Sequence, residues 1–284
     1  MNTAPFAESD LIRESADVIR ARMDEDGYLF VPGLVAPEAI RGVRHDILAL
    51  CSQAGWLAPG ADPDEGIAAP DIRYVAGQPE FMPVYTEIQK LESFHALAHQ
   101  PGIVEAVRTL VQQDVLVHPR NIARVIFPQN VAYTTPAHQD FIHIKGTPDT
   151  YTCWFPLGGC PVEMGGLAVL AGSHKAGIFH HEPALGAGGR GIPIDPLPDL
   201  WKANPFRAGD ALFFHSHLVH SGLDNRTSNL LRLSVDFRYQ GVSQPVAKGS
   251  LEPHHGTLSW DEIYVGWKST RYQRYWAEMS LRVE

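Results

Sequence analysis

The chain has 284 residues, of which 44% are hydrophobic and 19% charged, a composition typical of a globular protein that buries a substantial core. Its 23 Lys and Arg residues against 32 Asp and Glu residues give a formal net charge of −9. Because surfaces that bind phosphates carry an excess of Lys and Arg, this charge argues against nucleic acid or an anionic membrane as the main partner.

The N-terminal part, residues 1–114, is predicted to be mostly helical. Apolar residues recur at helical spacing between Ser9, a candidate helix cap, and Gly27, a candidate stop. The short apolar run 28–31, closed by Pro-Gly, predicts a buried strand. Further helices are predicted from Pro37 to Gly55, at about 83–99 and at 101–112, with a loop rich in Pro, Gly and Asp at 57–80.

From residue 115 the pattern changes to short runs rich in β-branched and aromatic residues, separated by turn residues, as in an antiparallel sandwich or barrel. The interval 182–200 is rich in Gly and Pro and is predicted to be a long loop of the kind that often covers a binding site. We expect one domain, with helical support in 1–114, a β core in 115–240 and a C-terminal extension in 241–284. The predicted strands are 115–118, 122–127, 151–157, 167–170, 211–214 and 231–239.

The sequence gives no sign of export or membrane insertion. No apolar run approaches the length of a membrane span, and residues 1–27 lack the basic start and apolar run of a signal peptide. The three cysteines, Cys51, Cys153 and Cys160, form no C-x-x-C motif and are too few for a disulfide framework. We therefore expect a cytoplasmic protein without a membrane partner.

Histidine is the unusual residue of this composition, with 14 copies. His138 and Asp140 are two positions apart, so on a strand both side chains would point to one face and could share a metal ion. A later segment offers a third ligand in His215, His217 or His220. Two histidines and one carboxylate occupy one face of an octahedron and leave the other positions open, the pattern of non-haem Fe(II) oxygenases.

Arg232 and Ser234 lie about a dozen residues after His220, in a run that reads as a strand. By the same period of two, their side chains share a face. A guanidinium and a hydroxyl on one face suit a carboxylate. The sequence thus joins a candidate metal site to an anchor for a dicarboxylate that also reaches the metal.

At this point the sequence resembles the phytanoyl-CoA dioxygenase family, over roughly residues 20–245. The family consists of Fe(II)- and 2-oxoglutarate-dependent oxygenases, so the resemblance implies a double-stranded β-helix, a jelly-roll or cupin-like fold that is mainly β, with the N-terminal helices packed on one sheet. It is closest to bacterial members that hydroxylate small carboxylated molecules, including terpenoid acids. The segments that carry it are 136–140, 153–157, 165–175, 209–210, His220 and 232–238.

The resemblance also implies roles for individual residues. Fe(II) would be held by His138, Asp140 and His220, the last preferred because it directly precedes a Ser-Gly turn and has the family spacing to the arginine. The cosubstrate 2-oxoglutarate would pair with Arg232. Ser234 and Thr152 would assist it, and Trp154 is either a wall of the cosubstrate pocket or a core aromatic residue.

Three residues are candidates for substrate binding. Arg124 lies within an otherwise apolar strand, where a buried arginine needs a carboxylate or a ligand as its partner. Arg190 lies in the Gly-rich loop expected over the mouth of the barrel, and His143 follows the metal-ligand segment. The resemblance implies a hydroxylase that consumes O2 and 2-oxoglutarate and releases succinate and CO2.

Two other classes of protein could use the same histidines. A zinc-dependent hydrolase or isomerase could hold its metal with two histidines and a carboxylate, but this reading leaves Arg232 and Ser234 unexplained. A non-catalytic barrel that binds a small molecule would need the histidines only for structure. Such a protein would still bind its ligand after replacement of His138 or Asp140.

Overall fold

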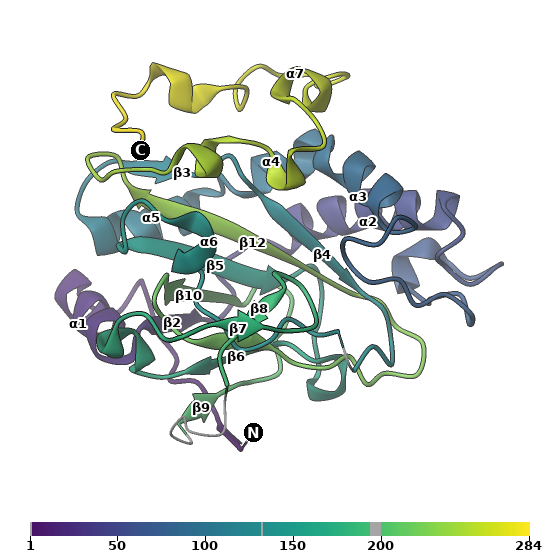
Figure 1. Ribbon diagram of the computed structural model, residues 1–284, viewed down its shortest axis with the longest axis horizontal. Coiled ribbons are helices and arrows are strands. Elements are labelled where there is room, and N and C mark those ends of the chain that lie inside the picture. The colour runs from purple at the N-terminus through teal and green to yellow at the C-terminus, as the bar shows by residue number, and fades with distance from the viewer. Residues whose placement is uncertain (1, 132, 194–199) are drawn as a thin grey trace.

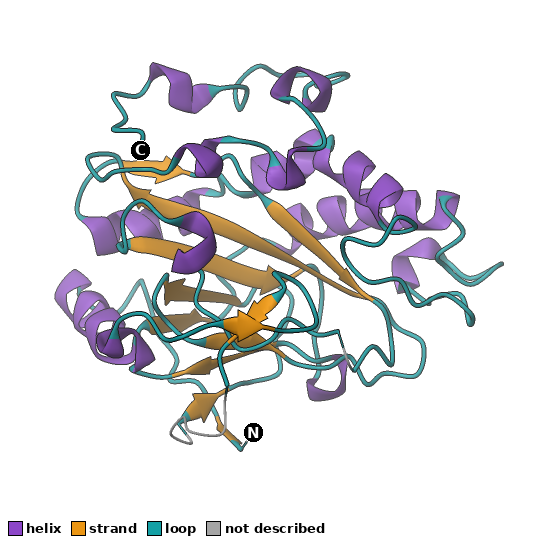
Figure 2. Cartoon of the chain, viewed as in Figure 1, coloured by secondary structure: helices purple, strands orange, loops and turns teal. Residues whose placement is uncertain are grey.

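The computed structural model describes residues 2–131, 133–193 and 200–284. It is mainly β, with helices on one side of the larger sheet (Figures 1 and 2), which confirms the predicted class. The helices are α1 (Ala16–Asp26), α2 (Pro37–Gln53), α3 (Met82–Gln89), α4 (Glu92–Leu97), α5 (Pro101–Val111), α6 (Phe141–Ile144) and α7 (Trp260–Ile263).

The strands form two main sheets and a small hairpin. The larger sheet has the order β2-β10-β5-β12-β3, with β4 also paired to β12, and the smaller sheet has the order β1-β9-β6-β11. Strands β7 and β8 form the hairpin. The bounds are β1 (Thr3–Ala4), β2 (Tyr28–Val31), β3 (Val115–Val117), β4 (Ile122–Ile126), β5 (Thr150–Pro156), β6 (Leu167–Leu170), β7 (Glu182–Pro183), β8 (Arg190–Gly191), β9 (Trp201–Lys202), β10 (Ala211–His215), β11 (His220–Gly222) and β12 (Arg232–Gly241).

Strand β12 divides its side chains between two environments, because successive residues of a strand point to opposite faces. Its apolar residues, such as Val235 and Phe237, join a hydrophobic cluster with helices α1 to α5. Its alternate residues are polar, buried and face the other way: Arg232, Ser234, Asp236, Arg238 and Gln240. The strand therefore builds the core with one face and a polar interior with the other.

Several local predictions were wrong, each for a physical reason. Helix α1 begins at Ala16 with Ser15 as its cap, because Ser9 is buried and accepts a hydrogen bond from Arg22 at 2.7 Å. The helix predicted at 83–99 is two helices, α3 and α4. Between them the Lys90 carbonyl accepts a hydrogen bond from the Trp267 indole at 2.8 Å.

The C-terminal extension folds back over the β core, as its yellow ribbon in Figure 1 shows. Tyr275 donates to the carbonyl of Val117 in β3 at 2.8 Å, and Val246 pairs with Val283. Part of the loop predicted at 182–200 forms the β7–β8 hairpin, while 194–199 lie outside the described residues. No helix in the described part of the chain is long and apolar enough to cross a bilayer.

Candidate active site

Three buried side chains converge between the two sheets: His138, Asp140 and His220. One ligand atom from each lies within 4.8 Å of the others. Asp140 Oδ1 is 3.6 Å from His138 Nε2 and 3.8 Å from His220 Nε2. The two histidines are also paired through their backbones, with N–O distances of 2.9 and 3.0 Å. Of the three later histidines, His220 is the one that the structure places in this cluster.

The geometry that brings His138 and Asp140 together differs from the predicted one. Only His138 has strand-like pairing, whereas Asp140 has helical dihedral angles (φ −62°, ψ −32°) and starts helix α6. The carboxylate therefore reaches the histidines because the chain turns into α6, rather than through strand alternation. The two residues share a metal site, but the structural reason given by the sequence pattern was wrong.

Both histidines present the nitrogen that a metal needs. His138 Nδ1 lies 2.8 Å from the carbonyl oxygen of Pro136, and His220 Nδ1 lies 2.9 Å from that of Leu218. Because a carbonyl oxygen can only accept, each Nδ1 carries a proton, which leaves Nε2 as the nitrogen of each ring that can face a metal. Burial, together with the neighbouring His138, lowers the pKa of His220 to about 3, so this imidazole is neutral and able to bind a metal.

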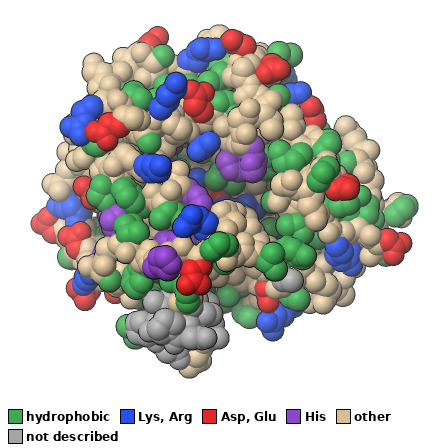
Figure 3. All heavy atoms as spheres, in the orientation of Figure 1, with side chains coloured by type: hydrophobic (Ala, Val, Ile, Leu, Met, Phe, Trp, Pro, Cys, Tyr) green, Lys and Arg blue, Asp and Glu red, His purple; other side chains and the backbone are tan. Residues whose placement is uncertain are grey.

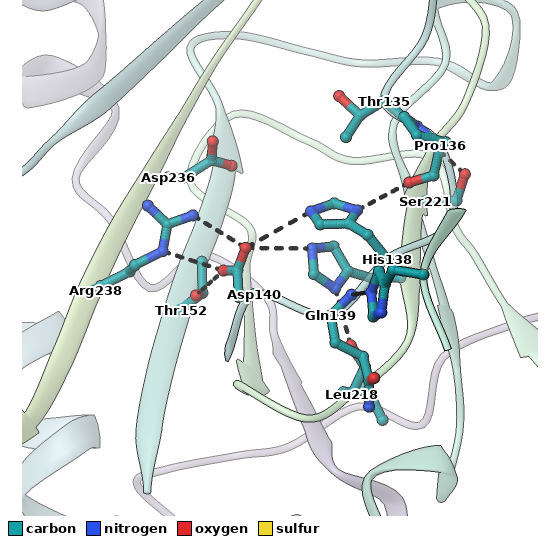
Figure 4. A network of polar contacts seen from close by, with 12 residues as sticks. Thr135, Pro136, His138, Gln139, Asp140, Thr152, Leu218, Ser221, Asp236 and Arg238 are labelled. Carbon is teal, nitrogen blue, oxygen red and sulfur yellow. Dashed lines mark hydrogen bonds and ion pairs between the residues drawn. The ribbon is translucent and has the colours of Figure 1, made fainter. Parts of the chain in front are cut away.

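Asp140 is held from the other side by Arg238 and Thr152 (Figure 4). Arg238 donates from Nε to Oδ2 and from Nη2 to Oδ1, both at 3.1 Å, and the Thr152 hydroxyl donates to Oδ2 at 2.6 Å. Burial alone would raise the pKa of Asp140, but the Arg238 charge outweighs it and holds the pKa well below its usual value. The carboxylate is therefore ionised and oriented.

Arg238 is a site residue that the sequence reasoning missed. The signal was present, because Arg238 follows Arg232 and Ser234 at the same spacing of two along one strand. Extending that alternation by two more steps places Asp236 and Arg238 on the same interior face.

Arg232 lines a narrow recess beside the three candidate metal ligands, and Ser234 is buried two residues further along the same face of β12. The Arg232 Nε and Ser234 Oγ atoms are buried and make no hydrogen bond among the described residues. Trp154 lines the same recess, 5.9 Å from the Arg232 guanidinium carbon, and it also packs in the core against Phe206. Buried polar groups are normally paired, so a cation and a hydroxyl left unpaired beside a metal site fit the distal carboxylate of 2-oxoglutarate.

Replacing Arg232 with Lys is expected to raise the KM for 2-oxoglutarate at least about 10-fold, because Lys keeps the charge and loses the planar fork that pairs with a carboxylate. The KM is measured from the steady-state rate of succinate formation at varied concentrations of 2-oxoglutarate. Ser234→Ala removes only a hydroxyl and should cost about 1 kcal/mol of cosubstrate binding. Unchanged KM values for 2-oxoglutarate in both variants would show that Arg232 and Ser234 do not bind the cosubstrate.

Thr152 has a partner other than the predicted one, since its hydroxyl bonds to Asp140. Thr152→Val keeps the shape and deletes that bond, so we expect weaker metal binding by about 10-fold, the size seen when groups that orient metal ligands are removed. Titration of the apoprotein with Fe(II) measures this. A variant that binds Fe(II) normally and changes only the KM for 2-oxoglutarate would instead support the predicted contact between Thr152 and the cosubstrate. That contact stays a prediction.

A second cavity, of about 350 Å³, opens on His138 and Asp140. In Figure 3 histidine and basic side chains gather around a hollow in the middle of this face. Arg124 and His143 line the cavity, as their predicted roles require. Arg124 is already paired with Asp236, at 2.6 Å from Nε to Oδ2, so the carboxylate partner expected for it lies within the protein. Burial lowers the pKa of His143 to about 4 and keeps it neutral.

Arg190 is not among the residues that line this cavity. It is exposed, lies in strand β8, and donates a hydrogen bond to the carbonyl of His181 at 2.9 Å. Its predicted contact with substrate stays a prediction. His215 lies 3.8 Å from Asp149 at the end of β10, and His217 packs against the ring of Phe141.

Two buried imidazoles and one ionised carboxylate, beside a recess with an unpaired arginine and an open cavity, are the arrangement of a non-haem iron oxygenase of the 2-oxoglutarate-dependent class. The family described as phytanoyl-CoA dioxygenase (PhyH) matches residues 23–233, and the chain belongs to this family. The chain is therefore an enzyme that uses Fe(II), 2-oxoglutarate and O2, and the predicted class and cofactors are confirmed.

Two curated relatives cover most of the chain. It is 26% identical over 245 residues to 1-deoxypentalenic acid 11-beta-hydroxylase of Streptomyces exfoliatus, covering 81% of this chain and 83% of the relative. The protein of the same name from Streptomyces arenae is 25% identical over 261 residues, covering 87% and 89%.

Solved structures show the same fold. The epimerase SnoN, in complex with Fe3+, alpha ketoglutarate and nogalamycin RO, has a TM-score of 0.58 and 20% identity, over 86% of this chain and 91% of SnoN. The alpha ketoglutarate dependent carbocyclase SnoK has a TM-score of 0.55 and 22% identity, over 85% and 89%. These neighbours carry out different reactions, so the fold alone does not determine the substrate.

Proposed function

We propose that this enzyme hydroxylates an unactivated C–H bond of a small carboxylated molecule. The observation that carries the proposal is the cavity of about 350 Å³, with partly apolar walls and basic side chains, that opens on the metal ligands. This volume is at the lower end for ligand pockets and suits a compact molecule rather than a whole acyl-CoA. Two relatives are named as hydroxylases of a carboxylic acid, which supports the same substrate class.

The reaction joins one oxygen atom of O2 to the substrate carbon, while the other enters succinate as 2-oxoglutarate loses CO2. Bound Fe(II) supplies the activation of O2 that no side chain can provide. His138, Asp140 and His220 hold the metal, and Arg232 with Ser234 orients the cosubstrate in its recess. As a carboxylate, Asp140 would complete with His138 and His220 the set of two imidazoles and one carboxylate that holds Fe(II) in non-haem oxygenases.

We also propose that residues 1–284 form one oxygenase domain on a double-stranded β-helix. The chain crosses repeatedly between the two main sheets. It passes from β5 in the larger sheet to β6 in the smaller one, and later from β10 in the larger sheet to β11 in the smaller one and back to β12. These crossings support a jelly-roll path. One hydrophobic cluster runs from α1 to β12 and joins the helical part to the sheet. The three cysteines are buried and unpaired, which supports a cytoplasmic location.

The test is an Fe(II)-dependent assay for succinate and for hydroxylated product across a panel of compact cyclic and aliphatic acids, including 1-deoxypentalenic acid. We expect at least one acid to stimulate succinate release and to gain one oxygen atom by mass spectrometry. Turnover of an ester or amide supported by zinc, with no acid stimulating succinate release, would contradict the proposal. In the same assay, Arg124→Gln and Arg190→Gln are each expected to raise the KM for the substrate. If one of these variants leaves the KM unchanged, the arginine that it replaces does not bind the substrate.

A further inference from the structure

The cavity of about 350 Å³ is lined by three arginines, one of which forms no ion pair within the described residues. Of its three arginines, Arg124 pairs with Asp236 and Arg238 pairs with Asp140. Arg120, in the turn between β3 and β4, forms no ion pair within the described residues, and its Nε is buried without a hydrogen-bond partner. A buried guanidinium nitrogen that lacks a partner in the protein is expected to find one in a ligand.

The C-terminal extension contributes two histidines to the wall beside Arg120. The turn His254–Gly256 places His254 and His255 in the cavity lining, although the family match ends at residue 233. His255 adopts a left-handed conformation (φ 64°), which is costly for a residue other than glycine and is typical of positions held for function. This part of the wall therefore lies outside the segment that matches the family.

A hydrogen-bond chain anchors His254 to helix α3. Gln89 Nε2 donates to the Tyr85 oxygen at 3.1 Å, and the Tyr85 oxygen lies 2.6 Å from His254 Nδ1. Burial holds the pKa of His254 well below its usual value, so the ring is neutral, and in the tautomer that accepts from the Tyr85 hydroxyl its single proton is on Nε2. In that tautomer His254 offers a hydrogen-bond donor in the wall that also contains Arg120.

We propose that Arg120, together with His254 and His255, binds the carboxylate of the substrate, and that the C-terminal extension thereby selects the substrate. The inference deepens the proposed function and rests on it. A substrate held by its carboxylate at Arg120 would occupy the same cavity that His138 and Asp140 line. One cation and neutral donors favour a singly charged acid, since a phosphate would bring a second charge with no balancing cation.

The test measures binding without turnover. Adamantane-1-carboxylate and its neutral isostere adamantane-1-carboxamide are titrated calorimetrically into the enzyme, loaded without oxygen with Fe(II) and saturating 2-oxoglutarate, which keeps the Arg232 recess filled. We expect the wild type to bind the carboxylate at least about 10-fold more tightly than the amide, and Arg120→Gln to abolish this preference. Arg207→Gln, which removes the same charge at an exposed residue outside the cavity lining, should retain it.

His255→Gly is the second variant. It removes the ring and relieves the left-handed strain, so we expect weaker carboxylate binding with an unchanged or raised Tm. Equal affinities of the wild type for acid and amide, or binding of neither, would overturn the proposal, as would a preference that survives in Arg120→Gln. The proposed function would fail separately, through the absence of hydroxylated product in the turnover assay.

Discussion

Replacement of His220 with Ala is expected to reduce Fe(II)-dependent succinate formation at least 100-fold. Loss of a group that merely orients a metal ligand already costs about 10- to 100-fold in metal affinity or activity, so loss of a ligand should cost more. His220 Nε2 faces Asp140 with its lone pair free, and no other described histidine joins His138 and Asp140 in the cluster. Succinate release at saturating 2-oxoglutarate, with Fe(II) titrated, separates weak metal binding from loss of turnover.

The matched control is His217→Ala, in the same short segment of chain. His217 packs against Phe141 and lies outside the ligand cluster, so its replacement should change the rate by no more than about 3-fold. If His217→Ala is inactive while His220→Ala keeps its activity, the ligand assignment is wrong. If neither replacement matters, the chemistry does not depend on this metal site.

The sequence predicted residues of this site better than it predicted their geometry. Residue types and spacing pointed to His138, Asp140, Arg232 and Ser234, because metal and carboxylate chemistry restrict which side chains can serve, and the family resemblance pointed to His220 among three later histidines. The turn into α6 that presents Asp140 was missed. Four residues of helix carry too few periodic positions to be recognised, and this helix is held by its tertiary setting.

Elements that depend on distant partners were also beyond the sequence. Strands β1 and β9 have two residues each; β1 pairs with β9 across about 200 positions of chain, and β9 also pairs with β6. The break between α3 and α4 coincides with a hydrogen bond from Trp267, which lies in the C-terminal extension. The place of His254 and His255 in the cavity follows from the same extension folding back, which no local pattern records.

Replacement of Arg238 with Met is expected to lower the free energy of unfolding of the metal-free protein by about 3–5 kcal/mol, the usual cost of removing one partner from a buried ion pair. Arg238 and Asp140 are both almost fully buried, and two hydrogen bonds of 3.1 Å join them. Without the guanidinium, Asp140 has lost the main group that keeps it charged in the interior. Urea unfolding of metal-free wild type and variant, near neutral pH, measures the difference.

The pH dependence of this difference has a definite sign. Because folding lowers the pKa of Asp140 below its ordinary value of 3.8, its contribution in the wild type is complete above that value and is lost as the pH falls through the folded pKa. In Arg238→Met, burial without the cation raises the pKa of Asp140, so its carboxyl takes up a proton as the pH falls. The difference in the free energy of unfolding between the two proteins should therefore be largest near neutral pH and shrink as the pH is lowered. A gap that widens on acidification would contradict this account.

Two further variants isolate the ion pair. Asp140→Asn removes the buried negative charge, so adding it to Arg238→Met should recover stability, and the double-mutant cycle gives the coupling between the two residues.

Arg232→Met replaces the other buried arginine of β12, which has no carboxylate partner among the described residues. Removing an unpaired buried cation should leave the metal-free protein as stable or more stable, at the expense of 2-oxoglutarate binding. The two arginines on one strand face would then show opposite signs: Arg238 stabilises the fold through a metal ligand, and Arg232 is kept in the interior for the cosubstrate.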